Sequence, residues 1–263
     1  MAESLHFFGL FVTPDCNRSQ VNSISDEFQI KLIDTIPDSG FYLELHDNRL
    51  ELLQSGKNSP GPIVVEFVTG KLAHRLKYGG GRGQPLARAV GMKPGYHPTI
   101  IDTTAGLGRD GFILASLGSQ ITLCERSPIL AALLQNGLKR AAVDPVIGDW
   151  VSQRIKLVHA DSSQYLLSLK DTQIPDVVYI DPMYPDKKGS ALVKKEMLAL
   201  QQLLGPDTNS LSLFQNALKS ARRRVVVKRP GHADWLHNQK PDTLIESKKT
   251  RYDIYVTLSS VEV

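Results

Sequence analysis

The stretch from residue 100 to residue 111 constrains the fold of this chain most strongly. It begins with Ile100, reaches Asp102, and continues as a turn that contains Gly106, Gly108 and Gly111. An apolar strand that ends in a carboxylate, followed by a glycine turn and a helix start, is typical of α/β proteins that bind a nucleotide or adenosyl cofactor. Glycine allows such a turn because it has no Cβ and lets a ligand approach the backbone. The G-x-G-x-x-G spacing alone is weak, and an ordinary strand-to-helix turn is the alternative.

The order of strand, turn and helix repeats from residue 99 onward. Strands are predicted over residues 100–101, 121–124, 155–158, 176–180 and 224–228, and helices over residues 111–117 and 128–142. This alternation predicts a doubly wound α/β fold with a mostly parallel sheet. The last two apolar runs, 243–247 and 251–258, have no helix between them. They must therefore pair as a hairpin at the edge, which brings the sheet to seven strands.

The first 70 residues follow a different pattern, which predicts a small α+β module (1–70) before a larger domain (71–263). Strands are predicted over 5–12 and 63–68, a partly helical segment over 24–36, and a hairpin of 41–45 with 49–53 around an Asp-Asn turn. Next, four glycines surround Arg82, and a helix is predicted over 84–90. The glycine-rich segment is either a cationic loop that contacts phosphate or closes over a cofactor, or a flexible linker.

Composition excludes several classes of protein. The hydrophobic share of 41% and charged share of 22% are ordinary for a globular chain and do not indicate disorder. No apolar run approaches the roughly 20 residues that span a bilayer. The first residues lack the basic segment of a secretory signal, and Cys16 and Cys124 are too few for a disulfide framework, so we expect a cytoplasmic protein. The net charge of +4 is compatible with a polyanionic partner.

An acidic residue follows each of the first four predicted strands of the parallel sheet: Asp102, Glu125, Asp161 and Asp181. The carboxyl ends of parallel strands face one crevice, so we expect these acids to surround one ligand site. Each of them alone could instead cap a helix. Glu125 lies 19 residues after Gly106, close to the ~20 expected for an acid that binds ribose hydroxyls. This spacing fits NAD and S-adenosylmethionine equally.

The fourth strand separates these two cofactors. Residues 181–184, Asp-Pro-Met-Tyr, resemble the D/N-P-P-Y/F signature of methyltransferases that modify exocyclic amines of nucleobases. The carboxylate of Asp181 and a nearby backbone carbonyl can accept the two N–H groups of such an amine. Pro182 stiffens the turn, and Tyr184 offers a ring on which an extruded base can stack. We therefore predict Asp181, Pro182 and Tyr184 as catalytic residues, although Met183 stands where the signature has its second proline.

Several motifs together resemble the bacterial ribosomal RNA small subunit methyltransferase J family. The resemblance spans roughly residues 63–263 and is carried by segments 73–83, 102–110, 125–126, 181–185, 190–197, 224–230 and 251–255. It implies a Rossmann-like class I fold and an enzyme that uses S-adenosylmethionine to methylate the N2 amine of a guanosine near the 3′ end of small-subunit ribosomal RNA.

The resemblance also implies a set of cofactor contacts: Arg109, Asp110, Glu125, Arg126, Asp161, Ser162 and Asp181. From the residues themselves, Glu125 suits the ribose, Asp161 with Ser162 suits adenine, and the backbone of residues 105–108, with Gly106 and Gly108, suits the methionine end. Asp102 is also predicted to bind the cofactor. Two points stay open. Ser163 could take the place of Ser162, and Arg109 and Arg126 could pair with Asp110 and Glu125 instead of contacting the cofactor.

Basic residues near the same rim predict an RNA-binding surface: Arg75, Lys77, Arg82, Lys187, Lys188, Lys194, Lys195, Lys228 and Arg229. Arg222 and Arg223 precede the fifth strand and are expected on the opposite rim. The substrate is expected to be small-subunit RNA, either naked or in an assembled subunit, with no metal ion and no membrane involved. The alternatives are an NAD-dependent oxidoreductase and an RNA-binding assembly factor without catalytic activity.

Overall fold

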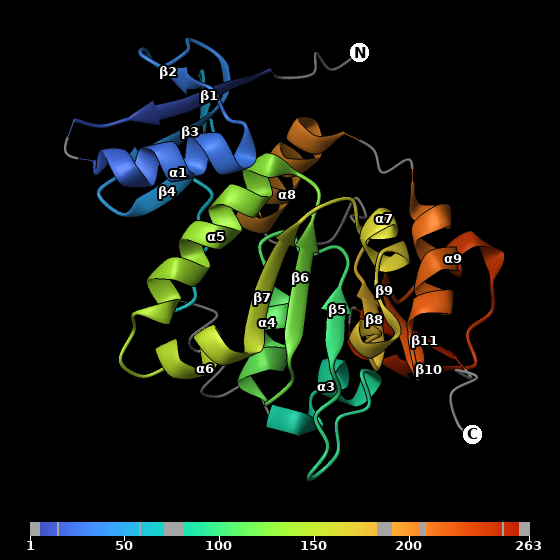
Figure 1. Cartoon of the computed structure of the whole chain (residues 1–263). Helices are drawn as coiled ribbons and strands as arrows, with labels where there is room; N and C mark the ends of the chain where they lie inside the picture. Colours follow the sequence, from blue (N-terminus) through green and yellow to red (C-terminus); the bar gives the residue numbers. More distant parts are fainter. Residues whose placement is uncertain are drawn as a thin grey trace.

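The computed structural model describes residues 6–14, 16–57, 59–70, 81–182, 191–205, 209–248 and 250–257, with only the backbone for 191–195 and 197. In this part of the chain two sheets are present (Figure 1). No helix within these ranges is both long and apolar enough to cross a membrane.

The larger sheet has seven strands in the order β10-β11-β9-β8-β5-β6-β7. Their bounds are β5 (Ile100–Asp102), β6 (Ile121–Glu125), β7 (Ile155–His159), β8 (Val177–Ile180), β9 (Arg224–Pro230), β10 (Thr243–Glu246) and β11 (Thr250–Val256). The pairs from β7 to β9 are all parallel, and β11 runs antiparallel to both β9 and β10. The predicted doubly wound fold and its terminal hairpin are therefore confirmed.

Helices cover both faces of this sheet. One face carries α3 (Pro85–Ala89), α4 (Arg109–Ser116), α5 (Pro128–Ala142) and α6 (Gly148–Arg154), and the other carries α7 (Ser162–Leu167) and α9 (Ser210–Ser220) (Figure 1). Alternate strand residues enter two separate cores: Tyr179 and Val226 face the α4 and α5 side, whereas Val178 and Val225 face α9. Burial on both faces explains why these strands read as continuous apolar runs. The helix α8 (Ala191–Leu204) packs Leu200 into the α5 core.

The smaller sheet has the order β2-β1-β3-β4 and lies beside α5 (Figure 1). Its strands are β1 (Phe7–Val12), β2 (Leu32–Ile33), β3 (Gly40–His46) and β4 (Arg49–Ser55). The predicted hairpin is confirmed, with Asp47 at φ 51° in its turn. The partly helical segment predicted over 24–36 is wrong in its bounds, because α1 spans Arg18–Phe28 and residues 32–33 form β2. Asn17 starts α1 by accepting a hydrogen bond from the Ser19 N–H at 2.8 Å.

Polar contacts from α5 hold the small sheet in place. The Asn136 side chain accepts from the Leu50 N–H at 3.1 Å and donates to the Asn48 carbonyl at 2.9 Å. Arg140 donates to Glu66 at 2.8 Å and also to the Val65 carbonyl. The hydrophobic core is likewise continuous from the small sheet to α5. A boundary near residue 70 stays a prediction, since residues 71–80 lie outside the described ranges.

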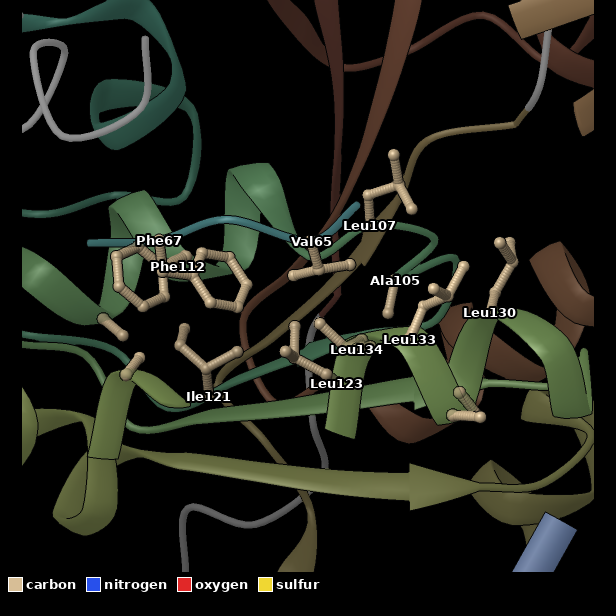
Figure 2. Packing of buried hydrophobic residues seen from close by; sticks show 14 of the residues in the cluster. Val65, Phe67, Ala105, Leu107, Phe112, Ile121, Leu123, Leu130, Leu133 and Leu134 are labelled. Carbon is tan, nitrogen blue, oxygen red and sulfur yellow. The ribbon is translucent and has the colours of Figure 1, made fainter. Parts of the chain in front are cut away.

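The strand predicted over residues 63–68 is wrong. Only Ile63 bridges the sheet, through paired hydrogen bonds of 2.9 Å with Leu52. The segment is apolar because α4 and α5 bury it, and Phe67 stacks on Phe112 with ring centroids 4.0 Å apart (Figure 2). Its backbone turns away from β4 where the Glu66 carboxylate accepts the Val68 N–H.

Gly137 allows this segment to approach α5. A Cβ at Gly137 would lie 2.4 Å from Val65 Cγ1 and 2.9 Å from the Val65 carbonyl oxygen. Alanine normally favours a helix over glycine by ~1 kcal/mol, but overpacking here costs about 1–3 kcal/mol. We expect Gly137→Ala to lower the free energy of unfolding in urea. Gly231→Ala is the control, because its Cβ would meet no atom within 4 Å; equal stability of both variants would contradict this packing.

Candidate active site

A cavity of about 1100 Å³ opens at the carboxyl ends of β5, β6 and β8. The strand order reverses between β5 and β8, which is where open α/β sheets bind ligands. The cavity brings together most of the predicted site residues: Asp102, Gly106, Arg109, Asp110, Glu125, Arg126, Asp161, Ser162, Asp181, Pro182 and Lys228. The convergence of the four strand-end acids is thus confirmed. Met183 and Tyr184 lie outside the described residues.

The two glycines of the turn have different structural roles. Gly106, at φ 55°, lines the cavity and donates its N–H to Glu125 Oε2 at 2.8 Å. Gly108, at φ 72°, precedes α4, and a Cβ there would lie 2.6 Å from Leu134 Cδ1. Gly108 therefore lets the turn pack closely on α5 and does not line the cavity.

Glu125 is a buried carboxylate with a fixed orientation. Its Oε2 accepts from Gly106, and its Oε1 accepts from the Ser127 N–H at 2.8 Å. Only 7% of the residue is exposed, and this burial raises its pKa, which the two backbone donors partly offset. A carboxylate oxygen can accept more than one hydrogen bond. Glu125 can therefore accept hydrogen bonds from a diol while it holds the glycine turn.

The acid and serines after β7 begin a helix as well as lining the cavity. Asp161 caps α7 by accepting the Gln164 N–H at 2.9 Å, so the helix-cap alternative describes part of its role. The Ser162 hydroxyl donates to the Thr103 carbonyl at 2.6 Å, whereas the Ser163 hydroxyl accepts from Asn216 at 2.7 Å. Both serines line the cavity, so the choice between them stays a prediction.

A chain of charged groups crosses the cavity from α4 to β9. Asp110 Oδ2 accepts from the Tyr179 hydroxyl and from Lys228 Nζ, both at 2.8 Å. The same Nζ donates to Asp181 Oδ2 at 2.7 Å. Thr104 Oγ1 accepts the Asp181 N–H at 2.6 Å and fixes the backbone where β8 ends. One ammonium thus joins two carboxylates that belong to different elements.

The two arginines of the rim do not both pair as the alternative interpretation predicted. Arg109 donates to Glu196 of α8 at 2.6 Å instead of pairing with Asp110. Arg126 lies close enough to Glu125 to lower its pKa, and it lines the cavity. Whether either arginine touches a cofactor stays a prediction.

Asp102 predicts a measurable pH dependence of stability. It is 3% exposed, and burial raises its pKa to about 8, against an ordinary value near ~3.9. Between pH ~4 and 8 the unfolded chain loses this proton while the folded protein keeps it, so stability falls as pH rises. Asp102→Asn removes this contribution, on the order of 1 kcal/mol per pH unit. Between pH 5 and pH 8, the free energy of unfolding in urea should decrease less for the variant than for the wild type. Equal decreases would contradict the raised pKa of Asp102.

A family model of SAM-dependent methyltransferases matches residues 24–257. A ribosomal RNA small subunit methyltransferase J of Aeromonas salmonicida is 54% identical over 216 residues, which cover 82% of this chain and 86% of the relative. The protein of the same name from Vibrio campbellii is 49% identical over 248 residues, covering 92% and 95%. The crystal structure of a SAM-dependent methyltransferase from Neisseria gonorrhoeae has a TM-score of 0.78 and 31% identity, covering 97% and 99%.

This chain belongs to the ribosomal RNA small subunit methyltransferase J family. It is a SAM-dependent methyltransferase with the Rossmann-like class I fold. The family resemblance inferred from the motifs is confirmed, and so is S-adenosylmethionine as the cofactor.

The donor set of the cavity fits this cofactor. Buried Ile129 and Leu130 line the cavity next to Glu125, so an apolar surface for adenine adjoins an acceptor for ribose hydroxyls. The volume of about 1100 Å³ exceeds the roughly 300–1,000 Å³ of typical ligand pockets. There is room for S-adenosylmethionine and for part of a substrate. Among the described residues no group of three His, Cys, Asp or Glu side chains could hold a metal ion.

Three residues that are predicted to bind RNA in this methyltransferase make other contacts in the structure. Lys228 is an internal partner of Asp110 and Asp181. Arg229 is 4% exposed and donates to the Asp234 carbonyl, because alternation along β9 turns it into the α9 side of the sheet. An Arg82 guanidinium nitrogen lies 3.3 Å from His97 Nε2. His97 comes shortly before β5 begins, so Arg82 lies at the opposite end of the sheet from the cavity.

The other predicted RNA contacts stay predictions. Arg75, Lys77, Lys187 and Lys188 lie outside the described residues, as do the side chains of Lys194 and Lys195 on α8. The expected place of the arginine cluster is supported: Arg222 donates to the Asp171 carbonyl and Arg223 pairs with Asp176, both before β8 begins.

Sequence reasoning missed Tyr179 and the carboxylate partners of Lys228. Both could have been found from strand alternation, since Tyr179 lies two residues before Asp181 and Lys228 two residues after the core residue Val226. Residues two apart on a strand share a face. Glu196, which binds Arg109, had no such signal, because the tertiary packing of α8 brings it to the site and no local sequence pattern does.

Proposed function

We propose that this enzyme transfers a methyl group from S-adenosylmethionine to the exocyclic N2 amine of a guanosine near the 3′ end of small-subunit ribosomal RNA. The observation that carries the proposal is the placement of Asp181 at the rim of the cavity, with its side chain 36% exposed and one oxygen held by Lys228. The names of the relatives support ribosomal RNA as the substrate class. The sequence 181–184 supports an exocyclic amine as the acceptor.

The exocyclic amine of guanine is a weak nucleophile, and the site must make it a better one. The lone pair of an exocyclic amine is delocalised into the base, so the amine must be held with its N–H groups bound to acceptors. Lys228 takes Asp181 Oδ2, and no donor in the described ranges reaches Oδ1. In the proposal Oδ1 accepts one N–H, and a neighbouring backbone carbonyl accepts the other.

The bound cofactor supplies an electrophilic methyl group on a positively charged sulfur. The leaving group is thus already activated, and the proposed reaction uses no metal ion. After transfer the methylated amine carries a positive charge and loses its proton to water, so no dedicated base is assigned. Tyr184 remains the proposed stacking platform for the extruded guanine.

The proposed reaction can be tested in vitro with purified enzyme and RNA. Purified enzyme should transfer labelled methyl groups from S-adenosylmethionine to small-subunit RNA, and digestion should yield N2-methylguanosine. Naked RNA and assembled subunits, each taken from cells that lack the gene, are the two substrates to compare. Transfer that decreases steeply with salt would support phosphate contacts by the basic residues of the rim. Label in any other nucleoside would contradict the guanine N2 assignment.

Two alternative functions are tested by the same preparation. Calorimetry should show binding of S-adenosylhomocysteine and none of NAD, and the reverse result would support an oxidoreductase. Binding of RNA without any methyl transfer would support an assembly factor. Because the proposed substrate is ribosomal RNA, the proposal also places the enzyme in the cytoplasm.

A further inference from the structure

The ammonium of Lys228 occupies a position that the proposed reaction does not itself explain. It extends from β9 between the first turn of α4 and the end of β8, where Nζ lies 2.8 Å from Asp110 Oδ2 and 2.7 Å from Asp181 Oδ2. Its side chain is 28% exposed, and it lines the same cavity.

The charges around Lys228 show what it must balance. Asp110 from α4, Asp181 directly after β8 and Asp102 from β5 all lie close enough to interact, and Tyr179 and Tyr252 are the neighbouring phenols. Arg109, the nearest cation on α4, is bound to Glu196. Among the described residues, Lys228 is the only cation that bridges Asp110 and Asp181.

The direction of the pKa values agrees with this geometry. Burial raises the pKa of Asp181, and Lys228 opposes the rise. The two carboxylates in turn raise the pKa of Lys228, so the ammonium stays charged over the whole physiological range. Two carboxylates that share a site without a cation cannot both ionise readily.

We propose that Lys228 is a positioning residue for methyl transfer: it holds Asp181 through Oδ2, keeps it ionised, and leaves Oδ1 oriented toward the substrate amine. This inference rests on the proposed function for its kinetic consequence. Its structural part, the ionisation of Asp181, does not. Asp110, fixed by the Tyr179 hydroxyl, then serves as the anchor that keeps Nζ in place.

The test compares Lys228→Met with Lys228→Arg, and uses Lys219→Met on exposed α9 surface as the matched control. In Lys228→Met we expect the pKa of Asp181 to rise by about 1–3 units, the effect of losing one opposite charge, so that kcat at pH 7 falls by up to about tenfold per unit. The activity should recover as pH is raised, because Asp181 then ionises without help. Lys228→Arg keeps the charge and should restore part of the activity at pH 7.

A second measurement does not depend on the reaction. Carbon-13 NMR of aspartate carboxyl groups in the substrate-free enzyme should show the Asp181 titration midpoint at higher pH in Lys228→Met than in wild type. An unchanged midpoint together with an unchanged pH profile would overturn the inference while leaving the proposed function intact. If wild type methylates no small-subunit RNA but the midpoint shifts as expected, the proposed function fails and the electrostatic role of Lys228 stands.

Discussion

Asp181→Ala should reduce kcat for methyl transfer at least about a hundredfold, the effect of removing one preorganised group that stabilises a transition state. The variant loses the acceptor that faces the substrate amine, while Thr104 still fixes the backbone at this position. Stability should change by less than about 1 kcal/mol because the Asp181 side chain is 36% exposed and Lys228 keeps its partner Asp110. Single-turnover rates with small-subunit RNA measure the first effect, and urea unfolding measures the second.

Two controls separate this loss from a binding defect. Asp181→Asn keeps the shape but removes the charge, so it should recover only a minor part of the rate. The dissociation constant for S-adenosylhomocysteine should stay within a few-fold of wild type in both variants. Wild-type turnover in Asp181→Ala would remove this carboxylate from the reaction, and a large loss of cofactor binding would assign it to the cofactor site instead.

Glu125→Ala should weaken the binding of S-adenosylhomocysteine by about a hundredfold or more. The buried carboxylate accepts hydrogen bonds from Gly106 and Ser127 and is proposed to accept from the ribose. Hydrogen bonds to a charged group contribute about 1.5–3 kcal/mol each, so the loss of the two proposed bonds from the ribose hydroxyls is sufficient for this effect. The turn that lines the cavity would lose its anchor at the same time, which should lower the melting temperature. Calorimetry and thermal unfolding measure the two effects.

The matched control for this prediction is Glu246→Ala, which removes an exposed glutamate at the edge strand β10. It should change neither binding nor melting temperature. Glu125→Gln should fall between the wild type and Glu125→Ala, because its amide oxygen can accept from only one of the two backbone donors. Wild-type affinity in Glu125→Ala would contradict the role of this residue in holding the cofactor loop.

The sequence predicts the large sheet well because both local and long-range signals agree there. The run 128–142 begins after Ser127, which caps it, and contains proline at its first position, so the start of α5 could be placed. The terminal hairpin follows from the missing crossover helix. Residues 63–68 were mistaken for a strand because burial by two helices and burial in a sheet leave the same apolar run.

The site was predictable to the extent that topology brings strand ends together. The four acids share one crevice because each lies at the carboxyl end of a parallel strand. Their positions after the predicted strands can be read from the sequence alone. Lys228 and Arg229 looked alike as neighbouring cations. Only the pleat of β9 distinguishes them, by directing Lys228 to the carboxylates and Arg229 into the opposite side of the sheet. Glu196 depends on the packing of α8 and could not be assigned from local pattern.

The most direct test of the proposed function is the modification pattern of ribosomal RNA in the organism. Small-subunit RNA from cells without this gene should lack one N2-methylguanosine near its 3′ end by mass spectrometry of nuclease fragments. A plasmid copy of the wild-type gene should restore that methyl group, and a copy carrying Asp181→Ala should not. An identical fragment pattern in cells with and without the gene would contradict the proposed reaction.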